Sequence, residues 1–124
     1  MDQEFVLVVD DTPDMRELLS YTLEVEGYNV LQACNGDEAL EVAATHKPAV
    51  IVMDVQMPIL DGIEATKRLK SERRLRDIPV IAYTAFSRDL PARDLFTAVI
   101  PKPCSPDEVL NAVLQSHSKR RPNQ

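Results

Sequence analysis

The feature that most constrains the fold is a series of five short apolar runs, rich in valine and isoleucine, that recur along the chain. They occupy residues 5–9, 29–33, 49–53, 79–83 and 98–101. Three of them are almost continuously apolar, a pattern typical of strands that are covered on both faces. The runs therefore predict a sheet buried between two layers of other structure.

Segments with helical periodicity lie between the runs. Four sets of residues recur at helical spacing: Met15, Leu18, Leu19, Thr22 and Leu23; Ala39, Leu40 and Ala43; Ile63, Thr66, Leu69 and Lys70; Val109, Leu110, Val113 and Leu114. Thr12–Pro13 and Ser105–Pro106 each place a capping residue before a helix-starting proline, and Gly27 stands where the first helix should end. This alternation predicts a doubly wound α/β domain with a parallel sheet.

Composition limits the class of protein. A chain of 124 residues can bury one core without disulfides, so Cys34 and Cys104 are expected to be reduced and buried or half-buried. The net charge of −6 argues against direct binding of nucleic acid. The acidic start and the lack of a long apolar run predict a cytoplasmic protein without membrane insertion. One domain is expected over residues 1–118, followed by a frayed basic tail over 119–124.

Polar residues follow four of the five predicted strands. Asp10 and Asp11 come after the first run, Asp54 after the third, Thr84 after the fourth and Lys102 after the fifth. In open α/β sheets the ligand crevice lies outside the carboxyl ends of the strands. We therefore expect these side chains to converge on one edge of the sheet.

Three converging carboxylates repel one another unless a cation lies between them. Magnesium suits such a site because it binds a few carboxylates and keeps several waters. Lys102 would add a second positive charge and Thr84 a hydrogen-bond donor, a set that suits a carboxylate attacking phosphorus. A simpler alternative is that Asp10 and Asp11 only cap the helix that begins at Pro13.

The same residues carry a resemblance to the receiver domain of two-component response regulators. Residues 53–64, with the sequence MDVQMPILDGIE, resemble the phosphoacceptor loop of that family. The segment VVDD at 8–11 is similar to its acidic pair, YTA at 83–85 to its switch threonine, and Lys102–Pro103 to its lysine segment. The resemblance covers nearly the whole chain.

The resemblance implies a role for each residue. Asp54 would be the phosphoacceptor, Thr84 would bond a phosphoryl oxygen, and Lys102 would pair with the phosphate. The implied magnesium ligands are Asp10 (largely through water), Asp11, Asp54 and the main-chain carbonyl of Gln56. The implied fold is the flavodoxin-like receiver fold with strand order 2-1-3-4-5, whose edge strand tolerates Pro101.

The resemblance also implies partners. The expected donor is a phosphohistidine on a sensor histidine kinase or on a histidine phosphotransfer protein. The output would be regulation of a downstream protein or relay of the phosphate. A homodimer of the chain is a further expected assembly. Such a domain is not an enzyme in the usual sense, since it assists only its own phosphorylation and dephosphorylation.

The chain departs from the family between Thr84 and Lys102, where the spacing is short and includes Pro91. We expect the fourth helix of the fold to be a turn or two around residues 92–96, or irregular. Val99 replaces the switch aromatic of the family. Phe86 and Phe96 either form an apolar patch for a partner or a second copy, or fill the space left by the helix.

Three alternative functions remain. A flavodoxin-type cofactor protein would need a phosphate-cradling loop after the first strand, where this chain has Asp10 and Asp11. A hydrolase would need a serine elbow or a Cys–His arrangement. The five intact site residues argue against a degenerate receiver that only docks other proteins, but the altered region after Thr84 keeps that alternative open. Gly62 is expected to adopt a backbone conformation that a side chain would hinder.

Overall fold

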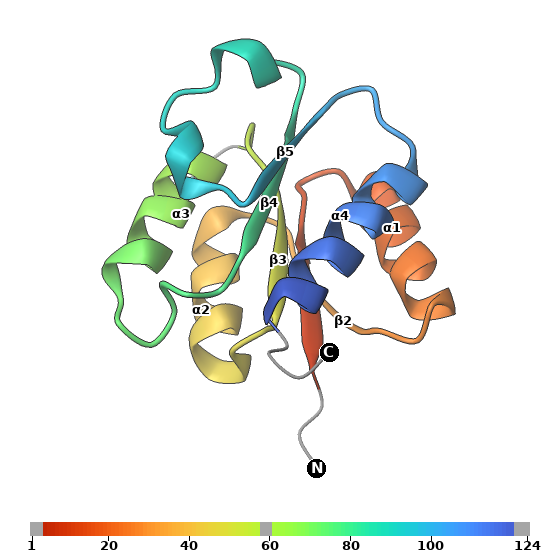
Figure 1. The fold of residues 1–124 in the computed structure, drawn as a ribbon, viewed down its shortest axis with the longest axis horizontal. Coiled ribbons are helices and arrows are strands. Elements are labelled where there is room, and N and C mark those ends of the chain that lie inside the picture. Colours follow the sequence, from red (N-terminus) through yellow and green to blue (C-terminus); the bar gives the residue numbers. More distant parts are fainter. Residues whose placement is uncertain (1–3, 58–60, 121–124) are drawn as a thin grey trace.

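The computed structural model describes residues 4–57 and 61–120, in a single layered unit (Figure 1). The elements in chain order are β1 (Phe5–Val9), α1 (Pro13–Val25), β2 (Asn29–Ala33), α2 (Gly36–His46), β3 (Val50–Asp54), α3 (Gly62–Ser71), β4 (Val80–Thr84), the 3₁₀ turns η1 (Ser87–Asp89) and η2 (Arg93–Leu95), β5 (Ala98–Pro101) and α4 (Pro106–Arg120). Within the expected phosphoacceptor loop, Pro58, Ile59 and Leu60 lie outside the described residues.

All five strands are parallel and are ordered β2-β1-β3-β4-β5. This order confirms the predicted doubly wound fold. Every residue of β3 and β4 is buried, as their continuous apolar sequences indicate. Both strands extend one residue further than the apolar runs, so Asp54 and Thr84 are the last strand residues.

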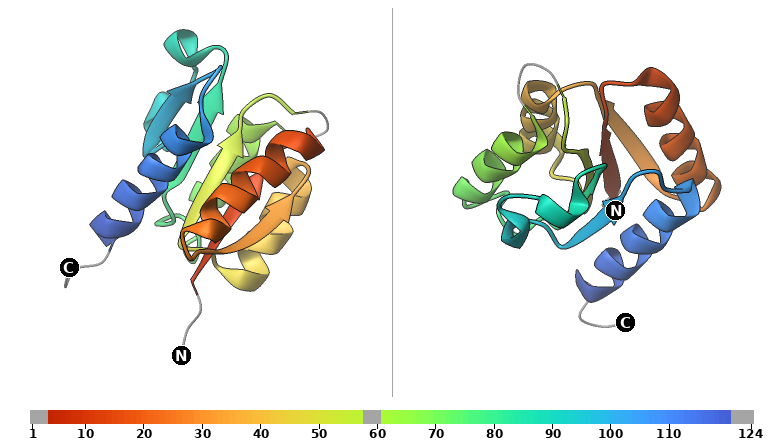
Figure 2. Two further views of the ribbon diagram at one scale, coloured as in Figure 1. Left: turned by 90° about the vertical axis from the view of Figure 1, so that its right-hand side faces the viewer. Right: turned by 90° about the horizontal axis from the view of Figure 1, so that it is seen from above.

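Helices cover both faces of the sheet (Figure 2). α2 and α3 pack on one face, where Ala39 and Leu69 join the strand residues in the core. α1 and α4 pack on the other face, with Leu23 and Val109 completely buried against it. The sheet therefore lies between two apolar layers, with β3 and β4 buried throughout and the edge strands β2 and β5 partly exposed.

The predicted apolar stripes are correct in their main residues and wrong at their margins. Leu18 of α1 is 47% exposed and Leu114 of α4 is 41% exposed. Ser20 is buried instead, because its hydroxyl donates to the main-chain carbonyl of Arg16 at 2.7 Å. A hydroxyl that is satisfied within its own helix can enter an apolar interface at little cost.

No α-helix forms between β4 and β5, both of which lie within the described residues. The prediction of a short or irregular segment there is confirmed, since only η1 and η2 interrupt the crossover (Figure 1). Phe96 is 9% exposed and packs into the core with Leu90, whereas Phe86 is 59% exposed. Phe96 thus takes the space-filling role and does not form a surface patch with Phe86.

Glycine occupies positions 27 and 62 for different structural reasons. Gly27 has a φ of 97° and terminates α1, as predicted. A side chain at Gly62 would be hindered, as expected, although Gly62 does not have a positive φ. A Cβ at Gly62 would lie 2.5 Å from the main-chain oxygen of Asp54, so the requirement is for space.

Three further expectations concern the cysteines, the tail and the membrane. Both cysteines are free, but Cys34 is exposed, which corrects the expectation that it is at least half-buried. α4 continues through Arg120 and residues 121–124 lie outside the described part, so the domain boundary expected at residue 118 stays a prediction. Within the described ranges, no helix has both the length and the apolar character needed to span a membrane.

Candidate functional site

Three carboxylates meet at the carboxyl ends of β1 and β3. Asp10 and Asp11 directly follow β1, and Asp54 closes β3. One carboxylate oxygen from each residue lies within 4.8 Å of those of the other two. Asp10 and Asp54 are only 1% and 2% exposed, whereas Asp11 is exposed. The predicted convergence of the acidic residues is present in the structure.

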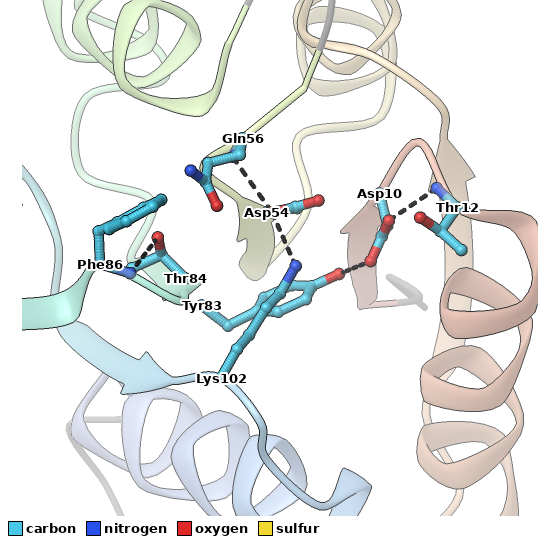
Figure 3. A network of polar contacts seen from close by, with 8 residues as sticks. All are labelled: Asp10, Thr12, Asp54, Gln56, Tyr83, Thr84, Phe86 and Lys102. Carbon is cyan, nitrogen blue, oxygen red and sulfur yellow. Dashed lines mark hydrogen bonds and ion pairs between the residues drawn. The ribbon is translucent and has the colours of Figure 1, made fainter.

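Lys102 supplies the cation of the site. Its Nζ lies 3.1 Å from Oδ1 of Asp54, and the same oxygen accepts the main-chain N–H of Gln56 at 3.2 Å (Figure 3). Burial raises the pKa of the Asp54 carboxyl, the hydrogen bond and charge of Lys102 oppose the rise, and the charge of Asp10 adds to it. The ammonium therefore only partly compensates the burial of this carboxylate.

The Asp10 carboxylate has a local role as well as a place in the acidic cluster. Its Oδ1 accepts the main-chain N–H of Thr12 at 2.8 Å. Thr12 is the N-cap residue of α1, but its own side chain makes no capping hydrogen bond. The main-chain carbonyl of Asp10 accepts from Nη1 of Arg16 at 2.8 Å. Asp10 thus fixes the turn between β1 and α1 while it faces Asp54.

Thr84 lies at the same edge, but its side chain is not hydrogen-bonded to Asp54. Its side chain is buried, and its Oγ1 accepts the main-chain N–H of Phe86 at 3.1 Å. The main-chain carbonyl of Thr84 accepts the N–H of Lys102 at 2.8 Å, which joins the ends of β4 and β5. Gln56, Thr84 and Phe86 border a cavity of about 740 Å³ beside the acidic cluster.

Sequence reasoning missed Tyr83, which lies at the centre of the site. Its hydroxyl donates to Oδ2 of Asp10, and Nζ of Lys102 lies 4.8 Å from the centroid of its ring (Figure 3). Burial, and after it the hydrogen bond to Asp10, raises the pKa of Tyr83 far above its usual range, so the phenol is a neutral donor. The available signal was a tyrosine in an aliphatic strand, since a buried tyrosine hydroxyl requires a polar partner.

The comparisons with known proteins agree with this geometry. The sequence model of the family described as "Response regulator receiver domain" matches residues 6–114. The chain belongs to this family.

Two curated relatives of this receiver domain match it over different shares of their own length. It is 42% identical to the alkaline phosphatase synthesis transcriptional regulatory protein PhoP of Bacillus subtilis, over 84% of this chain and 44% of PhoP. It is 44% identical to the polar-differentiation response regulator DivK of Brucella anthropi, over 66% of this chain and 67% of DivK. The chain therefore spans less than half of PhoP and about two thirds of DivK.

Solved receiver structures share the fold. The chemotaxis response regulator CheY4 of Vibrio cholerae superposes with a TM-score of 0.81 at 29% identity, over 92% of this chain and 98% of CheY4. The response regulator TrrA of Thermotoga maritima, solved in complex with Mg²⁺–BeF, has a TM-score of 0.83 at 30% identity, over 92% of this chain and 99% of TrrA.

The donor set of this receiver domain fits a hard divalent cation. Asp10, Asp11 and Asp54 offer carboxylate oxygens, the ligands that magnesium prefers. Only Asp54 has an ammonium beside it, so the cluster has an excess of negative charge among the described residues. A magnesium ion between the three carboxylates would remove that excess.

Proposed function

We propose that this receiver domain is a magnesium-dependent phosphoacceptor switch that takes a phosphoryl group on Asp54. The donor is a phosphohistidine of a sensor histidine kinase or of a histidine phosphotransfer protein, and the site of action is the cytoplasm. The phosphorylated form differs in shape from the free form, and this difference regulates a partner protein or passes the phosphate on.

The observation that carries this proposal is the environment of Asp54. Its carboxylate closes a buried strand, lies within 4.8 Å of two further carboxylates and is 3.1 Å from the Lys102 ammonium. Both hydrogen bonds that described residues make to this carboxylate end on Oδ1. Its Oδ2 lies on the side of Asp10 (Figure 3). The carboxylate is thus held in a fixed orientation, and its second oxygen accepts no hydrogen bond from the described residues.

The reaction is a displacement at phosphorus. A carboxylate oxygen of Asp54 forms a bond to phosphorus while the P–N bond of the donor breaks. The electron pair of the P–N bond stays on the imidazole nitrogen, which takes up a proton, and Asp54 becomes an acyl phosphate. Such transfers depend on positioning and charge neutralisation more than on covalent assistance from the protein.

The surrounding residues divide the remaining work. Asp10, Asp11, Asp54 and the main-chain carbonyl of Gln56 would hold magnesium, and Asp10 acts largely through water. When bound, magnesium supplies positive charge that offsets the negative charge of the incoming phosphoryl group. Lys102 moves from Asp54 to the new phosphate, and the Thr84 hydroxyl donates to a phosphoryl oxygen.

The connection between β4 and β5 supports a shared response. The N–H of Lys102 donates to the carbonyl of Thr84 at 2.8 Å, so the two phosphate-contacting residues are joined through the main chain. A shift of either side chain toward the phosphate changes the crossover that contains η1 and η2. Val99 stands where the family has its switch aromatic, so we propose that this main-chain connection between Thr84 and Lys102 carries the response instead.

The test is incubation of the protein with phosphoramidate, a donor with the same P–N bond, followed by intact-mass measurement. We expect one added phosphoryl group in the presence of Mg²⁺ and none after chelation. Asp54→Asn should not gain the group, whereas Asp94→Asn, which changes an exposed aspartate on η2, should gain it normally.

Two outcomes would contradict the proposal. Absence of any mass gain in the wild-type protein would favour a degenerate receiver that docks proteins without phosphate. A mass gain that survives Asp54→Asn would place the phosphoryl group on another residue.

A further inference from the structure

Tyr83 occupies a register position that places it beside the phosphoacceptor. Tyr83 of β4 pairs with Asp54 of β3 in the sheet. Side chains alternate along a strand, and Val52 and Ile81 lie in the same core cluster as Tyr83. Asp54 and Tyr83 therefore point to the same face, at the same height. The tyrosine is 0% exposed, so its position is determined entirely by the protein.

The hydroxyl of Tyr83 completes the restraint on Asp10. Oδ2 of Asp10 accepts from this hydroxyl, and Oδ1 accepts the N–H of Thr12 at 2.8 Å. Asp10 is 1% exposed, so water cannot readily replace either donor. The carboxylate cannot rotate without losing one of these hydrogen bonds, and its orientation toward Asp54 is thereby maintained.

The ring of Tyr83 restrains Lys102. Nζ of Lys102 lies 4.8 Å from the ring centroid, within the range of a cation–π interaction, while it also lies 3.1 Å from Oδ1 of Asp54. A lysine side chain is flexible, and 29% of this one is exposed. The face of the ring limits the positions that the ammonium can reach and keeps it near Asp54.

We propose that Tyr83 is a positioning residue with two parts: its hydroxyl presets Asp10 for magnesium, and its ring presets Lys102 for the phosphoryl group. The inference rests on the proposed function and adds to it one side chain that joins the anionic and cationic halves of the site. Neither part requires Tyr83 to touch the phosphoryl group.

Tyr83→Phe tests the hydroxyl, because it keeps the ring and removes only the donor. Titration of the protein with MgCl₂ by isothermal calorimetry should show an affinity about tenfold weaker than wild type, the lower end of the usual cost of losing an outer-shell hydrogen bond at a metal site. At saturating Mg²⁺ its phosphorylation by phosphoramidate should return to the wild-type rate. The matched control is Tyr21→Phe, the same change on a tyrosine that is 67% exposed.

Tyr83→Met tests the ring, because methionine fills irregular space but offers no aromatic face. Amide NMR shifts around Lys102 are recorded on addition of beryllofluoride at saturating Mg²⁺. Tyr83→Phe should respond as wild type does, and Tyr83→Met should lose most of the response. Tyr83→Phe retains the core volume, so the test of the hydroxyl does not depend on the folding of the methionine variant.

Equal Mg²⁺ affinities in wild type and Tyr83→Phe would overturn the role of the hydroxyl. A wild-type NMR response in Tyr83→Met would overturn the role of the ring. If Tyr83→Met does not fold, a defective response of Tyr83→Phe at saturating Mg²⁺ would equally overturn the division between ring and hydroxyl. Wild-type protein that binds Mg²⁺ but takes no phosphate would contradict the proposed function alone. Wild-type protein that binds no Mg²⁺ would contradict both.

Discussion

At the scale of single residues, the site is a balance between burial and charge. Asp54 is almost completely buried next to Asp10, and one ammonium, that of Lys102, lies beside it. Burial is the main reason that the pKa of Asp54 is raised, and Lys102 reduces the rise without cancelling it. In the absence of a cation, the charged form of Asp54 therefore costs folding free energy.

Asp54→Asn should consequently stabilise the magnesium-free protein, by about 1 kcal/mol, because a neutral amide is less costly to bury than a charged carboxylate. Lys102 can turn to water when its partner is lost, since 29% of its side chain is already exposed. With Mg²⁺ at a hundred times its dissociation constant the wild type should gain about 2.7 kcal/mol, and the variant much less. Thermal unfolding in chelator and in Mg²⁺ measures both differences.

The stabilisation should depend on pH in a defined direction. Because the folded-state pKa of Asp54 is raised above 3.8, the stability that its neutral form provides is present at low pH and is lost as the pH rises through the folded-state value. The advantage of Asp54→Asn in chelator should therefore grow as the pH rises from 3.8 to the folded-state pKa, stay constant above it and vanish below 3.8. An advantage that persists when Asp54 is protonated would show that burial of charge is not its cause.

At the scale of elements, the start of α3 sets the position of the end of β3, which carries Asp54. Gly62 is the first residue of α3, and Asp61 caps the helix by accepting the N–H of Glu64 at 2.9 Å. The N–H of Gly62 donates to the carbonyl of Val55 at 2.9 Å. The helix therefore begins in direct contact with the main chain at the end of β3, without room for a side chain.

Gly62→Ala should destabilise the protein by about 1–3 kcal/mol and slow phosphorylation of Asp54, because its Cβ would lie 2.5 Å from the Asp54 carbonyl oxygen and 2.8 Å from Cα of Val55. Gly27→Ala is the control. It meets no atom within 4 Å but has a φ of 97°, so it should cost stability without changing phosphorylation. Denaturant unfolding and intact-mass kinetics separate the two effects, and normal phosphorylation of Gly62→Ala would contradict the steric explanation.

The crossover between β4 and β5 depends on Phe96 in the absence of a helix. Phe96→Ala should cost about 3 kcal/mol of unfolding free energy, because the ring is buried against the core and leaves a cavity when removed. Phe86→Ala should cost less than about 0.5 kcal/mol, because Phe86 is 59% exposed. Equal costs for the two changes in urea unfolding would mean that the crossover does not pack as described.

At the scale of the whole molecule, the parallel sheet gathers residues that are far apart in sequence. Asp10, Asp54 and Lys102 follow or close three different strands, and all three strands end at the same edge. Lys102 is tied to the end of β4 through the carbonyl of Thr84. A change in charge at Asp54 can therefore be transmitted to β4 and β5 together.

Lys102→Ala should still accept a phosphoryl group on Asp54 but lose most of the change in shape, because in the proposed function the ammonium is the group that moves to the phosphate. Hydrogen exchange of β4, η1 and β5, compared between the Mg²⁺ form and the Mg²⁺–beryllofluoride form, measures that change. Lys67→Ala, on the exposed side of α3, is the control and should respond fully. An unchanged response in Lys102→Ala would assign the transmission to Thr84 alone.

Much of this protein was determined by local sequence. Alternating valine-rich runs and helical stripes predicted the parallel sheet, because the spacing of apolar residues along the chain distinguishes buried strands from amphipathic helices. The polarity of the strands placed Asp10, Asp54 and Lys102 at one edge, because carboxyl ends of parallel strands coincide. Proline between β4 and β5 predicted the loss of the helix there, since proline removes a backbone donor.

Only the tertiary structure decided the finer contacts. The role of Tyr83 depends on the register of β4 against β3, and the burial of Phe96 rather than Phe86 depends on how the crossover settles on the core. Gly62 proved to be limited by distance from Asp54 and not by its own φ. These features arise between segments that are distant in sequence, so no local pattern records them; they are set when the layers pack together.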